Sequence, residues 1–329
     1  MTPVTITAAA TGATAEILPE LGFNCYSFRV QRGGEPIELL WAAEGFREGG
    51  ERPSGSGIPI LFPFPGRIGQ GRFRYGGREY SLEVEEGREH ALHGFAYTRP
   101  WRVLERASDR VTAQFTASID DPTILDRWPA DFQITASYRI EQEELVLDIK
   151  LENPGQTSCP WGLGLHPYFR VPIDSAAGDG RAGRAAECQL QVPVAKAWEL
   201  DAMLPTGKIL AATEIEGMRG EDLRTGVTLG DRHLDDVFTG VEFVDGVATS
   251  RLRDPQSGHA IAVRFDDTFR ECVLYTPDTR EAVCIEPYTC VPDAYALAER
   301  GIETESIGTG LRLLEPGQSV EAWMRVGLA

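Results

Sequence analysis

The sequence lacks the features of membrane and secreted proteins. No run approaches the roughly eighteen consecutive apolar residues that a bilayer-spanning helix needs. The first twenty residues include Glu16 and Glu20, and they have neither a basic start nor a sustained apolar stretch, so they do not resemble a secretion signal. We therefore expect a cytoplasmic protein.

Metal-binding and disulfide patterns are also missing. The six cysteines show no CxxC spacing, which argues against both a zinc ribbon and a disulfide framework, so we expect reduced and mostly buried thiols. The sequence has no HExxH motif or other metal-ligand spacing, and a metal site would need ligands from remote segments. No metal is expected.

Two common types of catalytic loop are missing as well. There is no GxSxG motif and no glycine-rich phosphate loop, so neither a hydrolase nucleophile elbow nor a nucleotide-binding loop is predicted, and no cofactor is expected. The net charge of -18 would repel nucleic acid and anionic membranes. A neutral or cationic small molecule is a better candidate partner. With 42% hydrophobic residues, the chain can bury a sizeable core.

Helical periodicity is scarce, whereas alternation of apolar and polar residues is common. Residues 72–84 alternate on either side of Gly76 and Gly77, which predicts a hairpin, and residues 133–153 predict a second hairpin. The best helix candidate is 293–300. Further strands are expected at 111–119, 248–254, 259–266, 271–277, 281–287 and 319–326.

Many short strands without regular helices between them exclude a doubly wound α/β sheet. They predict an all-β fold, a large antiparallel β-sandwich. Residues 174–187 are rich in small and polar side chains, and we expect a mobile loop there. Strand-like sequence resumes on both sides of this loop without a shift in composition, so residues 1–329 are predicted to form a single domain.

A few polar residues occur in unusual settings. Glu286 follows the apolar run AVCI and precedes a proline, so it ends a buried strand, where a carboxylate is costly unless it has a partner. His166 lies between an apolar strand and a proline, and it could act chemically or simply pack. The other candidates, each of which could also be an ordinary turn or surface residue, are Arg67, His93, Asp235 and Asp236.

Aromatic residues cluster around these candidates. They include Phe62, Phe64, Trp161, Tyr168 and Phe169. Such side chains belong more often to a core than to a binding site. However, aromatic faces beside hydrogen-bonding groups also suit a polyhydroxylated ring, and histidine with glutamate can move protons in both directions without a cofactor.

Five motifs in order resemble the aldose 1-epimerase (galactose mutarotase-like) family. They are GIPILFPFPGRI with the following hairpin and ALHGF, then HPYF, LDDVF and EPYTCVPDA, spread over residues 57–295. The resemblance implies a large β-sandwich with one domain, the supersandwich of that family. It also implies interconversion of the α and β anomers of an aldose in a cleft across one sheet.

The resemblance assigns roles to individual residues. Glu286 would be the general base at the anomeric hydroxyl, and His166 the general acid at the ring oxygen. Arg67 and His93 would hold ring-side oxygens. Asp235 would accept hydrogen bonds from sugar hydroxyls, and it is preferred over Asp236 because the family's acid stands three residues before an aromatic residue, here Phe238.

The acid–base pair carries an expectation about charge. To protonate a ring oxygen, His166 should be charged in the resting enzyme while Glu286 is ionised, and mutual attraction would favour both states. A bell-shaped pH–rate profile follows.

Two departures from the family concern the substrate. Gly66 stands where the family usually has asparagine, and HPYF is the form found in a divergent branch. A free aldohexose such as glucose or galactose is expected, with the protein a monomer or homodimer.

Two alternative functions remain. A hexose-phosphate 1-epimerase would need extra basic residues near the cleft. Arg67 is the only basic residue in the motifs, although Arg72, Arg74 and Arg170 are close in sequence. A non-catalytic carbohydrate-binding sandwich would not need a matched acid and base.

Overall fold

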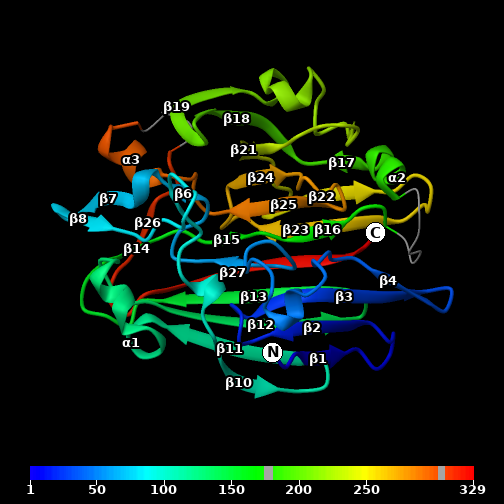
Figure 1. The fold of residues 1–329 in the computed structure, drawn as a ribbon, viewed down its shortest axis with the longest axis horizontal. Coiled ribbons are helices and arrows are strands. Elements are labelled where there is room, and N and C mark those ends of the chain that lie inside the picture. Colours follow the sequence, from blue (N-terminus) through cyan, green and yellow to red (C-terminus); the bar gives the residue numbers. More distant parts are fainter. Residues whose placement is uncertain (174–180, 303–307) are drawn as a thin grey trace.

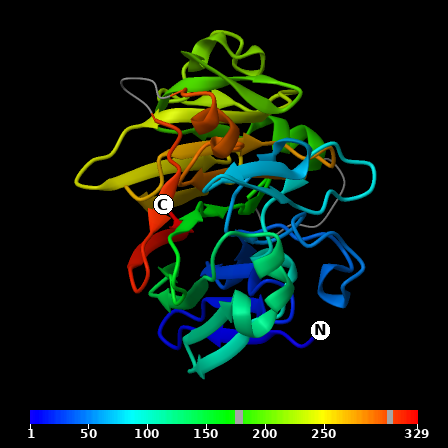
Figure 2. The ribbon, with the colours of Figure 1, turned by 90° about the vertical axis from the view of Figure 1, so that its left-hand side faces the viewer.

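The computed structural model describes residues 1–173, 181–302 and 308–329, and antiparallel strands dominate it (Figure 1). Two large sheets contain most of the strand residues, so the predicted all-β antiparallel fold is confirmed. Both views place the N-terminal strands beside β10–β13, and β21–β25 lie towards the other end of the molecule (Figure 2).

The larger sheet has nine strands, and it unites distant parts of the chain. Its C-terminal strand β27 lies between β13 and β23 and pairs with β13 along most of its length and with β23 over its second half. In spatial order the strands are β10 (Arg102–Arg106), β11 (Arg110–Thr116), β12 (Gln133–Glu141), β13 (Glu144–Glu152), β27 (Ser319–Leu328), β23 (Ala260–Asp266), β22 (Val247–Arg253), β17 (Gln189–Gln191) and β20 (Val227–Thr228).

The second sheet has eight strands and carries the candidate site. Its spatial order is β19 (Leu204–Ala211), β18 (Val194–Asp201), β21 (Asp235–Val241), β24 (Glu271–Tyr275), β25 (Ala282–Tyr288), β15 (Gly164–Leu165) and β5 (Ile60–Leu61), with β16 (Tyr168–Arg170) also paired to β25. The sequence motifs therefore converge on neighbouring strands.

Smaller elements surround these sheets. An N-terminal sheet comprises β1 (Val4–Thr7), β2 (Thr14–Leu18), β3 (Asn24–Arg32) and β4 (Glu35–Glu38). The paired short strands are β6 (Arg67–Ile68) with β9 (Ala91–Leu92), β7 (Arg72–Tyr75) with β8 (Arg78–Ser81), and β14 (Cys159–Trp161) with β26 (Arg312–Leu314). The α-helices are α1 (Ala117–Asp120), α2 (Arg181–Glu187) and α3 (Ala294–Glu299). The 3-10 helices are η1 (Phe46–Glu48), η2 (Gly69–Gly71), η3 (Ala96–Thr98), η4 (Pro122–Asp126), η5 (Ala212–Glu214) and η6 (Glu216–Met218).

Local sequence explains the two predicted hairpins, and both are confirmed. Gly76 and Gly77 have positive φ values of 57° and 79°, which a two-residue turn of this kind requires, and they join β7 to β8. In the second hairpin, β12 and β13 pair without a register shift, and alternate residues of β12 are buried. The strict period of two therefore set the register.

Three further expectations can be compared with the structure. All six cysteines are free and buried, as expected. The loop expected at 174–187 is partly wrong, because Arg181–Glu187 form α2, where alanine and arginine favour a helix; residues 174–180 lie outside the described residues. None of the helices described here is both long and apolar enough to cross a bilayer.

The core lies between the sheets, and β25 shows which face points towards it. Val283 and Ile285 belong to the large core cluster, which also contains residues of β12 and β23. Because neighbouring residues of a strand point to opposite faces, Cys284, Glu286 and Tyr288 lie on the other face of the eight-stranded sheet. Side chains on that face are available to a cleft.

Candidate active site

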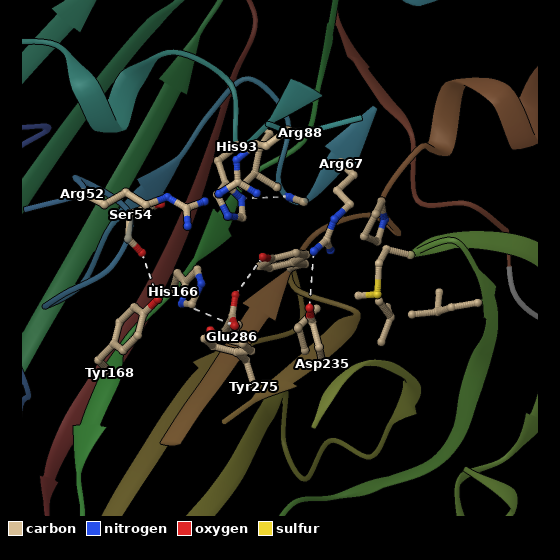
Figure 3. Close-up of a pocket in the computed structure, with 18 residues that line it drawn as sticks. Arg52, Ser54, Arg67, Arg88, His93, His166, Tyr168, Asp235, Tyr275 and Glu286 are labelled. Carbon is tan, nitrogen blue, oxygen red and sulfur yellow. Dashed lines mark hydrogen bonds and ion pairs between the residues drawn. The ribbon is translucent and has the colours of Figure 1, made fainter. Parts of the chain in front are cut away.

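A cleft opens on this outer face of the eight-stranded sheet (Figure 3). It encloses about 750 Å³ that no protein atom fills, open mouth included. All five residues predicted for the site, Glu286, His166, Arg67, His93 and Asp235, are among the eighteen that line it. The sequence motifs thus meet in one place.

The alternation of side chains along a strand decides which residues form the floor of the cleft. On β21, Asp235 and Val237 line it, whereas Phe238 belongs to the core on the opposite face. The preference for Asp235 over Asp236 agrees with this arrangement, because Asp236 is not among the lining residues.

His166 and Glu286 face each other at the bottom of the cleft. The His166 Nδ1 atom lies 3.3 Å from Oε1 of Glu286, and the two side chains are only 8% and 2% exposed. This is ion-pair distance without hydrogen-bond alignment, and Nδ1 has no hydrogen-bond partner among the described residues. The Tyr288 hydroxyl donates a 2.7 Å hydrogen bond to Oε2 of Glu286. One carboxylate oxygen is therefore held by tyrosine while the other meets the histidine.

Packing fixes the imidazole. The His166 ring stacks on Tyr168, with centroids 4.7 Å apart and planes 8° apart, and meets the edge of Tyr275. The Tyr168 hydroxyl in turn donates to the carbonyl of Ser54. Upstream, Gly164 lets β15 approach β25 closely, since a Cβ atom there would lie 2.7 Å from the Tyr288 ring. Gly164 is thus a packing requirement.

The remaining predicted residues line one wall. Arg67 forms an ion pair of 3.3 Å with Asp235. Short strands β6 and β9 pair Arg67 with Leu92, which brings His93 beside it, and His93 takes a positive φ of 66°. The backbone N–H of Gly66 donates to Nδ1 of His93 at 3.2 Å. That bond requires Nδ1 to be unprotonated, so Nε2 carries the proton of the neutral ring.

Burial controls the protonation of the central pair. It lowers the pKa of His166 to about 3, with smaller contributions from the positive charges of Arg52 and Arg67. It also raises the pKa of Glu286 well above the ordinary value, against the hydrogen bond from Tyr288. The expected resting state, a charged histidine beside an ionised glutamate, is therefore wrong for this structure. Desolvation favours a neutral imidazole and a neutral carboxylic acid.

Burial also shifts the pKa values of His93 and Asp235 in the cleft wall. Burial lowers the pKa of His93 well below its usual value, so this ring stays neutral. Burial also raises the pKa of Asp235, while Arg67 opposes the rise. Arg67 thus supports an ionised acceptor at the cleft wall.

Sequence reasoning missed several cleft residues. Arg52, Ser54 and Arg88 line the cleft, so Arg67 is not its sole cation. Arg52 lies in GGERPSGSG and Arg88 in EVEEGREH, which both resemble solvated surface loops, and no local signal distinguishes them. The arginines singled out by sequence proximity, Arg72, Arg74 and Arg170, are not lining residues.

One group of side chains has metal-ligand chemistry. Within the described ranges, potential ligand atoms of His166, Cys284 and Glu286 lie within 4.8 Å of one another. Metal binding needs a thiolate and a carboxylate, but burial raises the pKa of both Cys284 and Glu286 well above their ordinary values. The donor set therefore fits a metal poorly, and a metal-free site stays a prediction.

Comparison with known proteins agrees with the fold. The crystal structure of a galactose mutarotase-like protein from Clostridium acetobutylicum superposes with a TM-score of 0.81 at 22% identity, covering 97% of this chain and 93% of the other. A putative aldose 1-epimerase from Escherichia coli K12 gives a TM-score of 0.75 at 20% identity and covers 100% and 99%. At such identities these likenesses establish the fold alone.

Sequence relatives point the same way. The uncharacterized protein YihR of Escherichia coli is 23% identical over 262 residues, 79% of this chain and 75% of its own length. Galactose mutarotase of Mus musculus is 27% identical over 208 residues, 60% of this chain and 56% of its own length. The profile of the aldose 1-epimerase family matches residues 4–327, nearly the whole chain. The five ordered motifs, the sandwich and this match lead to one conclusion: the chain belongs to the aldose 1-epimerase family.

Proposed function

We propose that this protein is an isomerase of carbohydrate metabolism, an aldose 1-epimerase that interconverts the α and β anomers of an aldose. The observation that carries the proposal is the buried pair of Glu286 and His166, 3.3 Å apart, at the bottom of a cleft open to a small molecule. One group that accepts a proton beside one that donates it is what ring opening of a pyranose requires.

The reaction proceeds by proton transfer at two oxygens of the sugar. Glu286 takes the proton of the anomeric hydroxyl while His166 gives a proton to the ring oxygen, and the bond between that oxygen and the anomeric carbon breaks. The resulting aldehyde rotates about its bond to the next carbon. Closure on the other face, with the two residues exchanging roles, gives the opposite anomer.

The proton count of the pair reconciles this scheme with the shifted pKa values. A carboxylic acid beside a neutral imidazole and a carboxylate beside an imidazolium hold the same single proton. The neutral form dominates because both groups are buried, and transfer of one proton yields the reactive form. A bell-shaped pH–rate profile is still expected. Because the pKa of Glu286 lies above that of His166, its acid limb reflects His166 and its alkaline limb Glu286.

The cleft walls would hold the sugar. Asp235 would accept from sugar hydroxyls, while Arg67, which is paired with Asp235, and the neutral His93 would donate to ring-side oxygens. Binding alone requires such hydrogen bonds but not a buried acid–base pair, which favours catalysis over a binding-only role. The cytoplasmic location and the monomeric or homodimeric state stay predictions.

Polarimetry of freshly dissolved α-glucose and α-galactose tests the proposal. The wild type should accelerate relaxation to the anomeric equilibrium. Glu286→Gln and His166→Asn should each lose roughly 10²- to 10⁴-fold of this activity, because each removes one proton-transfer group. Glu286→Gln keeps side-chain size, and both variants keep hydrogen-bonding capacity.

Unchanged circular dichroism and thermal unfolding would show that the variants are folded. Sugars that carry charged groups belong in the same assay, monitored by NMR exchange spectroscopy. If no aldose relaxes faster with the wild type than in buffer, or if either variant retains full activity, the proposed function is wrong.

A further inference from the structure

The cleft holds more positive charge than its own acids balance. Its eighteen lining residues include three arginines but only two carboxylic acids, Asp235 and Glu286. Arg67 is paired with Asp235, and Arg88 Nε lies 2.8 Å from Oε2 of Glu85. Across the described part of the chain, no carboxylate lies within ion-pair distance of Arg52, and its guanidinium donates no hydrogen bond.

This surplus charge contrasts with the composition of the whole protein. The chain has 50 acidic residues against 32 lysines and arginines, so acidic groups are in excess over the chain as a whole. Arg52 instead extends towards His93 and His166 (Figure 3). Its charge contributes to lowering the pKa of both histidines. A cation at this position opposes protonation of His166 unless an anion offsets it.

The loop that carries Arg52 is anchored to strands β16 and β3. The Gly55 N–H donates to the Arg52 carbonyl at 2.9 Å, and the Ser54 carbonyl accepts from the hydroxyl of Tyr168 at 3.0 Å. The Ser56 carbonyl accepts from the amide of Asn24. Because Tyr168 also stacks on His166, the backbone of this loop is tied to the acid–base pair.

The geometry also indicates which part of a sugar would meet Arg52. In Figure 3, His166 lies between Arg52 and Glu286. Consistent with this order, Arg52 influences the pKa of His166 but is not among the main influences on Glu286. With Glu286 at the anomeric hydroxyl and His166 at the ring oxygen, the group beyond His166 is the exocyclic carbon attached next to that oxygen.

We propose that the substrate of this cleft is an aldopyranose with an anionic substituent on its exocyclic carbon, bound by the guanidinium of Arg52. The inference rests on the proposed epimerase function and deepens it. Phosphate, sulfate and carboxylate share the required chemistry, since each accepts charge-assisted hydrogen bonds from arginine. The bound anion also offsets the positive charge beside His166 and so favours its protonation.

The test compares anomer exchange of glucose with that of glucose 6-phosphate, glucose 6-sulfate and glucuronate, by NMR exchange spectroscopy. The wild type should show a kcat/KM at least tenfold higher for one of the three anionic sugars than for glucose. The three arms separate a tetrahedral dianion, a tetrahedral monoanion and a planar monoanion. In Arg52→Gln the ratio of anionic to neutral kcat/KM should fall roughly 10- to 100-fold, as expected for a lost hydrogen bond to a charged group.

Two further variants are matched to this change. Arg52→Lys retains the charge without the planar fork and should keep part of the preference. Arg47→Gln removes an exposed arginine of η1 that does not line the cleft, and it should leave the ratio unchanged. A preference for glucose over all three anions, or a ratio that Arg52→Gln does not lower, overturns the inference while the epimerase function stands.

Calorimetric titration of wild type and Arg52→Gln with the same sugars separates the two proposals. If no sugar is epimerised but an anionic sugar binds and the binding is lost in Arg52→Gln, the proposed function fails and the ligand class is supported. If none of the anionic sugars binds at millimolar concentration, the ligand class is wrong as well.

Discussion

At the scale of single residues, Tyr288 is the group that tunes Glu286. Its hydroxyl donates to Oε2 of the buried carboxyl and is the main influence that lowers the Glu286 pKa against burial. The bond therefore favours the carboxylate, which is the form that can accept a proton from a sugar. Without it, the proton shared with His166 would reside on Glu286 more of the time.

Tyr288→Phe should therefore slow the reaction and shift one limb of its pH profile. The plateau of kcat/KM should fall by roughly tenfold, because a hydrogen bond to a charged group is lost. The pKa of Glu286 rises further, so the alkaline limb should move to higher pH. The measurement is kcat/KM against pH.

Tyr275→Phe is the matched control. Tyr275 also lines the cleft, but its hydroxyl does not bond to Glu286 in the described structure. The alkaline limb of the pH profile of Tyr275→Phe should match that of the wild type. An alkaline limb that stays in place, or moves to lower pH, in Tyr288→Phe contradicts this account of the pair.

At the scale of elements, the loop before β6 and the loop after β25 fit together at Gly66. This residue stands where the family usually has asparagine, and it has a positive φ of 64°. A Cβ atom at Gly66 would lie 2.6 Å from Cγ of Pro292 and 2.9 Å from its Cβ. Pro292 lines the cleft as well, so its carbons border the position that an asparagine side chain would occupy.

Gly66→Asn should therefore destabilise the protein by about 1–3 kcal/mol rather than restore a sugar contact. Two causes contribute, the strain of a side chain at a positive φ and the clash with Pro292. Gly77→Asn separates them, since Gly77 also has a positive φ but a Cβ atom there would meet nothing within 4 Å. Urea unfolding measures both changes. Adding Pro292→Gly to Gly66→Asn should recover part of the loss, and equal stability of the two asparagine variants would contradict the steric explanation.

The secondary-structure elements also show how much of the fold could be predicted from the sequence alone. Glycine pairs and strict alternation are local signals, and they located both hairpins and most strands of the nine-stranded sheet, but only a minority of those in the eight-stranded sheet. The order of the motifs located Glu286, His166 and the three wall residues. Arg52 was missed because tertiary packing, not local pattern, decides which surface loop folds over a cleft. The charge state of His166 was missed for the same reason, since burial cannot be read from neighbours in sequence. The helix at Arg181–Glu187 was missed although its alanines and arginines favour a helix.

At the scale of the whole molecule, one large hydrophobic cluster connects the parts. It includes Ile6 and Ala15 of the N-terminal sheet, Ile134 of the nine-stranded sheet, and Val283 and Ile285 of the eight-stranded sheet. Shared burial of this kind couples the unfolding of one sheet to that of the others. We therefore propose that residues 1–329 act as a single domain.

Urea unfolding should then show one transition. Tryptophan fluorescence and far-ultraviolet circular dichroism should give coincident midpoints, because the six tryptophans are spread along the chain. Separate midpoints, or a plateau between two steps, would indicate independent domains.

The position of β27 has a consequence for biosynthesis. It pairs with β13 and β23 in the middle of the nine-stranded sheet, yet it is the last strand of the chain. On the ribosome, β13 is finished roughly ten seconds or more before β27 is made, at ordinary elongation rates. Until then one edge of β13 has no native partner. The nascent protein must therefore keep an open strand edge from pairing with other chains, which makes late synthesis the step at which chaperones matter most.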